Sequence, residues 1–336
     1  MSANIPSFIV GIAIVFSVFL GTHAQDNKTA DKGVFLENKT ATKKEYANPV
    51  TNNSLESKLA GLAALLNPSK TPKLPEIPPV KLSLAKDIPA TNLEVKAGIS
   101  INEKGKILYA KNINQQFPIA SITKLMTALV VLDQLNPDSA AEVSQNAIDT
   151  YGETGNLLPG EKLTVRDLLY IMLVDSSNDA AIALAENIEK NGRNFVELMN
   201  KKAKNLHLEN SSFADPSGLN PKNISTSYDL AVLLNNDLMN PLIEKIISTR
   251  EIDILSADGK TIHHLINTNE LFGKISGMEA GKTGYTEEAG ECLIVVIKNK
   301  TDGRYFISNI LGAGIGMRFI EMEKLIRWTK QAAGWQ

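Results

Sequence analysis

The chain is short of residues on which several classes of protein depend. Its 336 residues include a single cysteine, Cys292, so an intramolecular disulfide framework is excluded. The 22 glycines are too few for a collagen-like repeat, and the net charge of −2 gives no excess of positive charge of the kind that nucleic-acid binders carry. Only four histidines occur, and neither H-E-x-x-H nor H-x-x-E-H is present. We therefore expect no metal, no cofactor and no nucleic-acid partner.

Charge is also missing from residues 1–24, which contain no Lys, Arg, Asp or Glu. The almost wholly apolar run from Phe8 to Leu20 has the length of a signal-peptide hydrophobic region. Because no basic side chain precedes this run, an uncleaved membrane anchor remains the alternative, with residues 5–21 as the tether. Residues 1–24 are thus predicted to be a signal peptide or an N-terminal membrane anchor, and the rest of the chain is expected to act outside the cytoplasm.

Residues 25–85 differ in composition from the remainder. They hold six of the 14 prolines, and nine lysines against six acidic residues, which predicts an extended linker rich in Pro and Lys. Within it, Ser54–Leu66 places leucines at a helical spacing, which predicts a short amphipathic helix. Its polar face is not basic, so a docking helix is favoured over a membrane-surface helix. Residues 86–336 are left as the folded domain.

Both kinds of secondary structure are predicted in this domain. Alternating apolar residues predict a hairpin over residues 95–110, and two further strands are predicted near the C-terminus, at Glu291–Lys298 and Tyr305–Leu311, separated by a turn at residues 300–303. The predicted helices are Ala120–Gln134, Leu163–Leu173, Asp179–Ile188, Phe195–Leu206 and Ser227–Leu238, with a closing helix from about Met317 to Ala333. Strands at both ends with helices between them predict an antiparallel sheet made from both ends of the domain and an inserted helical lobe.

Three short motifs carry residue types suited to acyl transfer. Ser121–Lys124 reads S-x-x-K and places a hydroxyl and an amine on one face of a predicted helix. Ser176–Asn178 reads S-x-N before another helix, and Lys282–Gly284 reads K-T-G before the strand of Cys292. Each is weak alone, because S-x-x-K occurs by chance in many chains and Ser and Asn commonly cap helices. Their occurrence together and in this order is a strong signal.

In this order the motifs resemble the signature of the penicillin-recognising serine acyl-transferases. The likeness covers residues 85–333, including Pro118–Ala128, Asp175–Ala181 and Phe213–Leu219, and is to the serine D-alanyl-D-alanine carboxypeptidases, the low-molecular-mass penicillin-binding proteins. It implies an α/β (α+β) fold of the β-lactamase/transpeptidase type, with an antiparallel five-stranded sheet covered by helices and an inserted all-helical lobe. It also implies peptidoglycan peptides ending in D-Ala-D-Ala as substrates and β-lactams as covalent inhibitors.

The chemistry of the motifs suggests a role for each polar side chain. Ser121 becomes a nucleophile only if a base accepts its proton, and Lys124 is the candidate because no histidine is suitably placed. Burial and the second cation, Lys282, would both lower the pKa of Lys124. Ser176 would pass a proton toward the leaving amine, and Asn178 would hold the amide carbonyl of the substrate.

The K-T-G segment is expected to bind the end of the substrate. Lys282 and Thr283 offer a charge and a hydroxyl to a terminal carboxylate, which favours an exopeptidase. Gly284 would let the substrate lie close to the strand. The resemblance implies an oxyanion hole made of the Tyr285 and Ser121 N–H groups.

Relatives with the same motifs leave alternatives open. The loop Phe213–Asn220 has no glutamate of the kind that speeds deacylation in β-lactamases, so a slowly deacylating peptidase is expected. Motif spacing does not separate a carboxypeptidase from a D,D-endopeptidase that cleaves cross-links. The absence of residues for a second domain after the closing helix shifts some weight toward the compact endopeptidases. A non-catalytic scaffold with the same fold is the remaining alternative.

Overall fold

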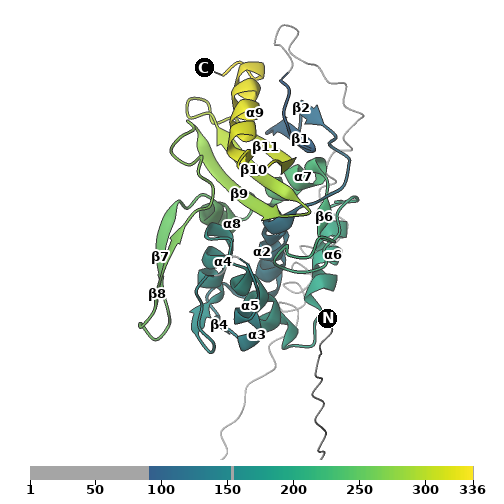
Figure 1. Ribbon diagram of the computed structural model, residues 1–336. Helices are drawn as coiled ribbons and strands as arrows, with labels where there is room; N and C mark the ends of the chain where they lie inside the picture. The colour runs from purple at the N-terminus through teal and green to yellow at the C-terminus, as the bar shows by residue number, and fades with distance from the viewer. Residues whose placement is uncertain (1–90, 153–154, 336) are drawn as a thin grey trace, which may run out of the picture. The chain divides into compact units, whose positions relative to one another are not determined.

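The computed structural model describes residues 91–152 and 155–335. The predicted leader, the linker and the helix Ser54–Leu66 lie outside these residues. The described part contains a five-stranded antiparallel sheet in the order β2-β1-β11-β10-β9 (Figure 1). Its strands are β1 (Ala97–Asn102), β2 (Ile107–Lys111), β9 (Met278–Thr286), β10 (Gly290–Lys298) and β11 (Tyr305–Ala313). The predicted fold class, with a sheet built from both ends of the domain, is confirmed.

Both faces of this sheet are covered. In β10 the even-numbered residues from Cys292 to Val296 belong to the core shared with the helical lobe, and the odd-numbered residues from Leu293 to Ile297 pack toward α9 (Arg318–Ala332). The alternation follows from the two-residue period of a strand. It explains why β10 is apolar at every position from Cys292 to Ile297: each side chain is buried on one face or the other.

The lobe inserted between the two halves of the sheet is mainly helical. Its helices are α2 (Thr123–Gln134), α3 (Gln145–Ile148), α4 (Val165–Val174), α5 (Asn178–Glu189), α6 (Phe195–Asn205), α7 (Ser227–Asp237) and α8 (Pro241–Ile247). The sequence predicted one apolar face for the helix after Ser121, but α2 is buried at every position from Thr123 to Val131. The reason is that α4, α5, α6 and α7 all pack around it. The S-x-x-K motif therefore runs from η2 into the central helix of the lobe, with Lys124 in the first turn of α2.

Short elements complete the lobe. They are the 3-10 turn η2 (Ala120–Ile122), and the pairs β3 (Phe117–Pro118) with β6 (Ile224–Ser225), β4 (Ala140–Glu142) with β5 (Lys162–Thr164), and β7 (Glu251–Leu255) with β8 (Ile262–Ile266). The β7–β8 hairpin runs along one side of the helices (Figure 1). The sequence predictions missed it, together with α3 and α8.

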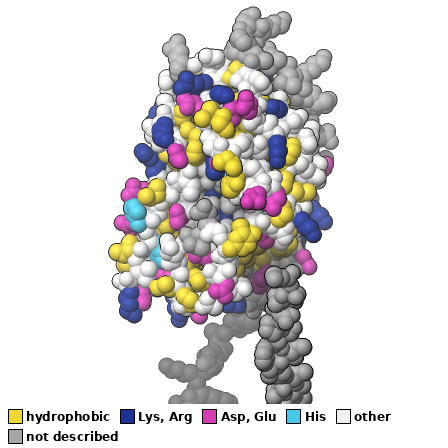
Figure 2. Space-filling model, viewed as in Figure 1, with side chains coloured by type: hydrophobic (Ala, Val, Ile, Leu, Met, Phe, Trp, Pro, Cys, Tyr) yellow, Lys and Arg dark blue, Asp and Glu magenta, His cyan; other side chains and the backbone are white. Residues whose placement is uncertain are grey.

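The predicted helix boundaries agree with the structure to within a few residues, with one instructive shift. The helix expected from Leu163 begins at Val165, because Lys162–Thr164 forms β5 and Thr164 forms a capping box with Asp167. On the face that Figure 2 shows, Lys and Arg side chains are interspersed with Asp and Glu side chains. Among the described residues, no helix has the length and apolar character needed to cross a membrane.

Candidate active site

The first motif lies where η2 passes into α2. The Nζ of Lys124 donates a hydrogen bond to the Oγ of Ser121 at 2.9 Å. The same Nζ donates to Asn178 Oδ1 and to the carbonyl oxygen of Ser217, each at 2.7 Å. The Lys124 side chain is fully buried. One amine thus joins the S-x-x-K motif, the S-x-N motif and the loop that contains Ser217.

The K-T-G motif lies on β9, the edge strand of the sheet next to η2. Lys282 is 1% exposed, and its Nζ donates to Ser176 Oγ at 2.8 Å and to Thr283 O at 3.0 Å. The Oγ1 of Thr283 shares a hydrogen bond of 2.6 Å with that of Thr268. The S-x-N motif therefore lies between two lysines, with Asn178 bonded to Lys124 and Ser176 bonded to Lys282.

Gly284 sets how closely β9 approaches the nucleophile. A Cβ at this position would lie 3.1 Å from the carbonyl oxygen of Ile119 and 3.1 Å from the amide nitrogen of Ser121. Both are backbone atoms, so they cannot swing aside as a flexible side chain would. The glycine predicted on chemical grounds is thus also required by packing.

The backbone is strained at Ser176 itself and at Ala120, the residue before Ser121. Ser176 has a φ of 65°, and Ala120, which precedes Ser121, has a φ of 46°. Residues other than glycine pay about 1–2 kcal/mol for such left-handed conformations, and they keep them only where the surroundings hold them. For Ala120 part of that hold is Gly218, whose φ is 92° and at which a Cβ would lie 2.1 Å from the Ala120 carbonyl oxygen.

Asp215 organises the loop that supplies the Ser217 carbonyl. Its Oδ1 accepts hydrogen bonds from Ser217 N and Oγ, both at 2.6 Å, and from Gly218 N at 2.7 Å. Its Oδ2 accepts from Asn220 N and Asn223 Nδ2, both at 2.6 Å. The sequence analysis used this loop for the family likeness and for its lack of a glutamate, and it assigned Asp215 no role. The signal was available, since Asp-Pro-Ser-Gly is a turn sequence in which Asp binds backbone N–H groups.

Arg318 is a second residue that sequence reasoning missed. At the start of α9, its Nη1 donates to the carbonyl oxygen of Gly284 at 3.3 Å and its Nη2 pairs with Glu291 Oε1 at 2.9 Å. Burial would raise the pKa of Glu291, but hydrogen bonds from Arg318 and its positive charge hold that pKa below the ordinary value. A second cation therefore contacts the K-T-G strand, and no local motif identifies it.

Ser121 opens onto a cleft of about 490 Å³. Asn178 and Gly218 line it with Ser121, and its walls are formed by Tyr151 with Gly152, by Leu219 with Pro221, and by Tyr285–Glu288. Tyr285 is 45% exposed, whereas Thr283 is 4% exposed and lies deeper in β9. A peptide could enter from the exposed side and meet the nucleophile at the floor.

The other reactive side chains lie elsewhere. Cys292 is fully buried, and burial raises its pKa to about 11, so it is not a nucleophile at neutral pH. Among the described residues, no three His, Cys, Asp or Glu side chains are grouped to hold a metal ion. His263 is buried against Glu161, and His264 pairs with Asp253 on the hairpin surface. Neither histidine bonds to Ser121.

The chain is similar in sequence and in structure to known proteins. A family model described as D-alanyl-D-alanine carboxypeptidase matches residues 86–314. The D-alanyl-D-alanine carboxypeptidase DacF of Bacillus subtilis is 37% identical over 212 residues, which are 61% of this chain and 54% of the relative, so the chain spans about half the length of that protein. A D-alanyl-D-alanine endopeptidase of Pseudomonas aeruginosa is 34% identical over 67% of this chain and 74% of the relative. The solved Streptomyces K15 DD-transpeptidase aligns with a TM-score of 0.68 at 28% identity, over 73% of this chain and 100% of that one.

Proposed function

The chain belongs to the D-alanyl-D-alanine carboxypeptidase family, and from this we infer that it is a serine-type D,D-carboxypeptidase that removes the terminal D-alanine from peptidoglycan stem peptides. The reaction would pass through an acyl-enzyme on Ser121, and β-lactams would trap that residue. The observation that carries this proposal is the hydrogen bond of 2.9 Å between Lys124 Nζ and Ser121 Oγ within a buried network. It couples a hydroxyl to a base, which is what a serine nucleophile needs.

The arrangement of hydrogen-bond partners around Lys124 Nζ supports its role as the base. Asn178 Oδ1 and the Ser217 carbonyl accept two of its N–H bonds. When the amine is neutral, its lone pair is left directed at Ser121 Oγ, from which it can take the proton as Oγ attacks the carbonyl carbon. The same proton can later pass on toward the leaving group, which returns Lys124 to its neutral form.

Departure of the terminal D-alanine needs a proton on its nitrogen as the C–N bond breaks. We assign this transfer to Ser176, which would give its hydroxyl proton to the nitrogen and regain the proton that Lys124 took from Ser121, so that Lys124 and Ser176 are both restored. The hydrogen bond of Ser176 with Lys282 Nζ at 2.8 Å supports the assignment. The negative charge on the carbonyl oxygen would be stabilised by the N–H groups of Ser121 and Tyr285. Water then cleaves the ester on Ser121 and regenerates the hydroxyl.

Preference for a terminal carboxylate follows from charge on the K-T-G strand. Lys282 Nζ donates to the carbonyl oxygen of Thr283, and Arg318 Nη1 donates to the carbonyl oxygen of Gly284. A carboxylate beside Thr283 would therefore meet positive charge from two side chains, whereas a peptide that continues beyond this point would not.

A D,D-endopeptidase is the second candidate, because it performs the same acyl transfer on a cross-linked D-alanyl bond. The similarity to proteins described as D-alanyl-D-alanine endopeptidases, such as that of Pseudomonas aeruginosa, favours keeping it. Mass spectrometry of the products from intact muropeptides separates the two. Loss of single D-alanine residues supports the carboxypeptidase, and conversion of dimers to monomers supports the endopeptidase.

The acyl-enzyme is tested with a fluorescent penicillin. The native protein should be labelled covalently, and Ser121→Ala should abolish the label. A label that survives Ser121→Ala would overturn the assignment of Ser121 as the acylated residue. A native protein that neither labels nor releases D-alanine from a pentapeptide would indicate a non-catalytic scaffold. Adduct turnover within seconds would instead indicate a β-lactamase.

We further propose that residues 86–336 are the catalytic domain and that it works outside the cytoplasmic membrane, where peptidoglycan is built. Residues 1–24 stay a predicted signal peptide or anchor, with 5–21 as the membrane tether and 25–85 as the linker. Cell fractionation of the full chain and of a chain lacking residues 1–24 tests this. Equal recovery of both in the cytoplasm would contradict it.

A further inference from the structure

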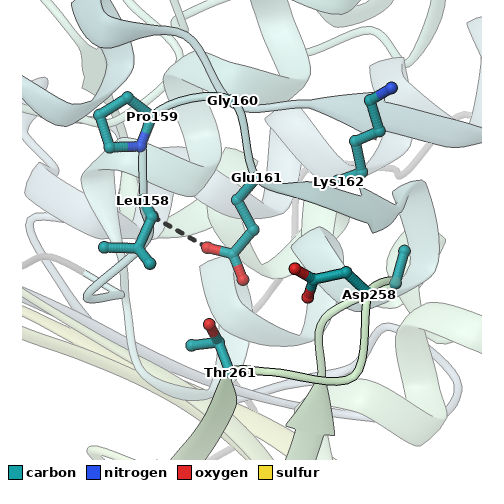
Figure 3. Close-up of a pocket in the computed structure, with 8 residues that line it drawn as sticks. Leu158, Pro159, Gly160, Glu161, Lys162, Asp258 and Thr261 are labelled. Atoms are coloured by element: carbon teal, nitrogen blue, oxygen red, sulfur yellow. Dashed lines mark hydrogen bonds between the residues drawn. The ribbon is translucent and has the colours of Figure 1, made fainter.

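A buried hydrogen bond between two ionisable side chains, outside the three motifs, connects the β7–β8 hairpin to the lobe. The Nε2 of His263, on β8, lies 2.8 Å from Glu161 Oε1, and the two side chains are only 2% and 5% exposed. The other carboxylate oxygen of Glu161 accepts a hydrogen bond of 2.9 Å from Leu158 N, the dashed line in Figure 3. No step of the proposed reaction uses this pair, yet a buried pair of ionisable groups costs desolvation energy. We therefore expect this pair to contribute to the structure of the site.

The second ring nitrogen of His263 points to such a role. Nδ1 lies 3.1 Å from the carbonyl oxygen of Gly155, and because a carbonyl only accepts, Nδ1 is the donor. The amide of the same residue, Gly155 N, donates to both carboxylate oxygens of Asp179, at 2.9 and 3.0 Å. His263 and Asp179 thus hold Gly155 from its carbonyl and its amide.

Gly155 in turn packs against the S-x-N motif. A Cβ on Gly155 would lie 2.4 Å from Ile171 Cγ2 and 3.0 Å from Ser177 Oγ. The Asp179 carboxylate that binds Gly155 also accepts from the Ser177 hydroxyl and from Ala180 N at 2.8 Å. Ser177 is the N-cap of α5. The chain of contacts therefore runs from His263 through Gly155 to the turn that carries Ser176 and Asn178.

The same hairpin also reaches the K-T-G motif. Beyond the end of β8, Thr268 N donates to Val174 O at 3.3 Å, and Thr268 Oγ1 bonds to Thr283 Oγ1 at 2.6 Å. One continuous segment, residues 263–268, therefore contacts the surroundings of both the second and the third motif. Ser176 needs such support, because its φ of 65° is strained.

We propose that His263 is a positioning residue for the peptidase reaction: through Gly155 it fixes the turn that holds Ser176 and Asn178 against Lys282 and Lys124. It touches no substrate. The cavity of about 440 Å³ beside Glu161, between Leu158–Lys162 and the hairpin turn at Ala257 and Asp258, contains none of the motif residues (Figure 3). This inference rests on the proposed function for its catalytic readout, but its structural readout does not.

Two substitutions separate the contacts of His263. In His263→Asn, the side-chain amide can reach the Nδ1 position and still donate to Gly155, but Glu161 loses its partner. In His263→Gln, the amide can reach the Nε2 position and still bind Glu161, but the Gly155 carbonyl loses its donor. His264→Gln is the matched control, because His264 is the next residue on β8 and its side chain is 53% exposed. All three are studied in the full chain.

The rate of acylation by fluorescent penicillin is then compared with the urea-unfolding midpoint. We expect His263→Gln to slow acylation about 10- to 100-fold, because a misplacement of about 1 Å can cost about 100-fold. His263→Asn should stay within about 3-fold of the native rate although it removes the His263 contact from the buried Glu161 side chain, and it should be the less stable of the two variants. A merely structural role predicts the opposite order, with acylation following stability. That order, or equal losses in both variants, would overturn the proposal.

Hydrogen exchange gives a readout that does not need catalysis. The amides of Gly155 and Ala180, both bonded to Asp179, should exchange faster in His263→Gln and at the native rate in His263→Asn and His264→Gln. Unchanged protection of Gly155 in His263→Gln would refute the link. If the native protein is not acylated but this exchange pattern is found, the proposed function fails while the positioning contact stands.

Discussion

The amine of Lys124 is fixed in position by hydrogen bonds, so the proposed reaction requires it only to gain or lose a proton. Three acceptors surround its Nζ at 2.7 to 2.9 Å, and they come from residues 3, 54 and 93 positions away along the chain. The amine is therefore fixed by the tertiary structure and has no conformational search to make before the reaction. This preorganisation matters because a base must be within hydrogen-bond reach of the proton that it takes.

Replacing Lys124 with arginine separates positive charge from basicity. A guanidinium keeps the charge but is not deprotonated in proteins, so it cannot accept the Ser121 proton. We expect Lys124→Arg to slow penicillin acylation by about 100- to 10,000-fold. Lys201→Arg, at an exposed position on α6, is the control and should label normally. Labelling of Lys124→Arg at the native rate would exclude Lys124 as the base.

Cys292 should be inert in the folded protein. Its side chain is fully buried, and burial raises its pKa to about 11. At pH 8 roughly one thiol in a thousand would then be ionised, and the thiolate is the reactive form. A colorimetric thiol reagent should therefore titrate no cysteine in native protein and one after unfolding in urea. Rapid reaction of the native protein, or loss of penicillin labelling on treatment, would contradict the buried position.

At the scale of elements, the approach of the Asp215 loop to η2 depends on one glycine. A Cβ on Gly218 would lie 2.1 Å from the Ala120 carbonyl oxygen, so Gly218→Ala must displace η2 and, with it, Ser121. We expect acylation to fall at least about 10-fold.

Gly259→Ala is the matched control for this substitution. Gly259 has a similar φ of 73° but nothing within 4 Å of the added Cβ, so it should lose only about 1 kcal/mol of stability and label normally. Equal losses of labelling in the two variants would attribute the effect to backbone strain alone.

Asp237, at the end of α7, gives a prediction about pH. It is fully buried, and neither carboxylate oxygen has a hydrogen-bond partner among the described residues. Burial raises the pKa of Asp237 well above the ordinary value. The folded state thus holds a proton that the unfolded chain releases near pH 4. The contribution of Asp237 to stability is therefore complete below about pH 4 and is lost as pH rises through its folded-state pKa.

Asp237→Asn removes this dependence because an amide does not ionise. In urea unfolding at pH 8 the variant should be more stable than the native protein by about 1–3 kcal/mol, with a smaller difference at pH 5. Asp149→Asn, at an exposed position, should change stability by less than about 0.5 kcal/mol at both pH values. A destabilised Asp237→Asn would mean that the carboxylate has a favourable partner.

Local signals in the sequence were sufficient for the long elements. Ser177 and Thr226 cap the helices that follow them, and the short apolar run around Ile294, bounded by polar residues and a turn, predicts a strand. They were insufficient for α3 and α8, which have four and seven residues and so show too little of a helical period. The β7–β8 hairpin was missed because its strands have only five residues each, and in β8 apolar Ile262 and Ile266 lie on the exposed face, which blurs the contrast between a polar and an apolar face.

The site was predicted as a list of residues, and its geometry could not be. The contact of Lys282 with Ser176 spans 106 residues, and that of Lys124 with Ser217 spans 93, so neither follows from any local pattern. Arg318 was missed because it acts on the backbone of a strand 34 residues away, whereas Asp215 was missed although its partners lie in its own loop. The family likeness supplied the five-stranded sheet, whereas the roles of the site residues stay predictions until they are tested.

At the scale of the whole molecule, the sheet joins the first and last strands of the described residues. Strand β1 pairs with β11, with Ala97 opposite Leu311 and Asn102 opposite Phe306, so the second strand of the sheet is more than 200 residues from its neighbour along the chain. The helical lobe is inserted between these strands. The sheet therefore combines β9, which carries the K-T-G motif and contacts η2, with the strands that precede η2 in the chain.

This arrangement predicts where the domain can be cut. A chain of residues 86–336 keeps every residue of both hydrophobic cores, the first of which is Leu93. It should unfold in a single transition and label with penicillin at the rate of the full chain. A chain that begins at Glu103 lacks β1, which leaves β11 with an unpaired edge and β2 without a neighbour. We expect that chain to be insoluble or unlabelled, and failure of residues 86–336 to fold would show that the predicted boundary at residue 86 is wrong.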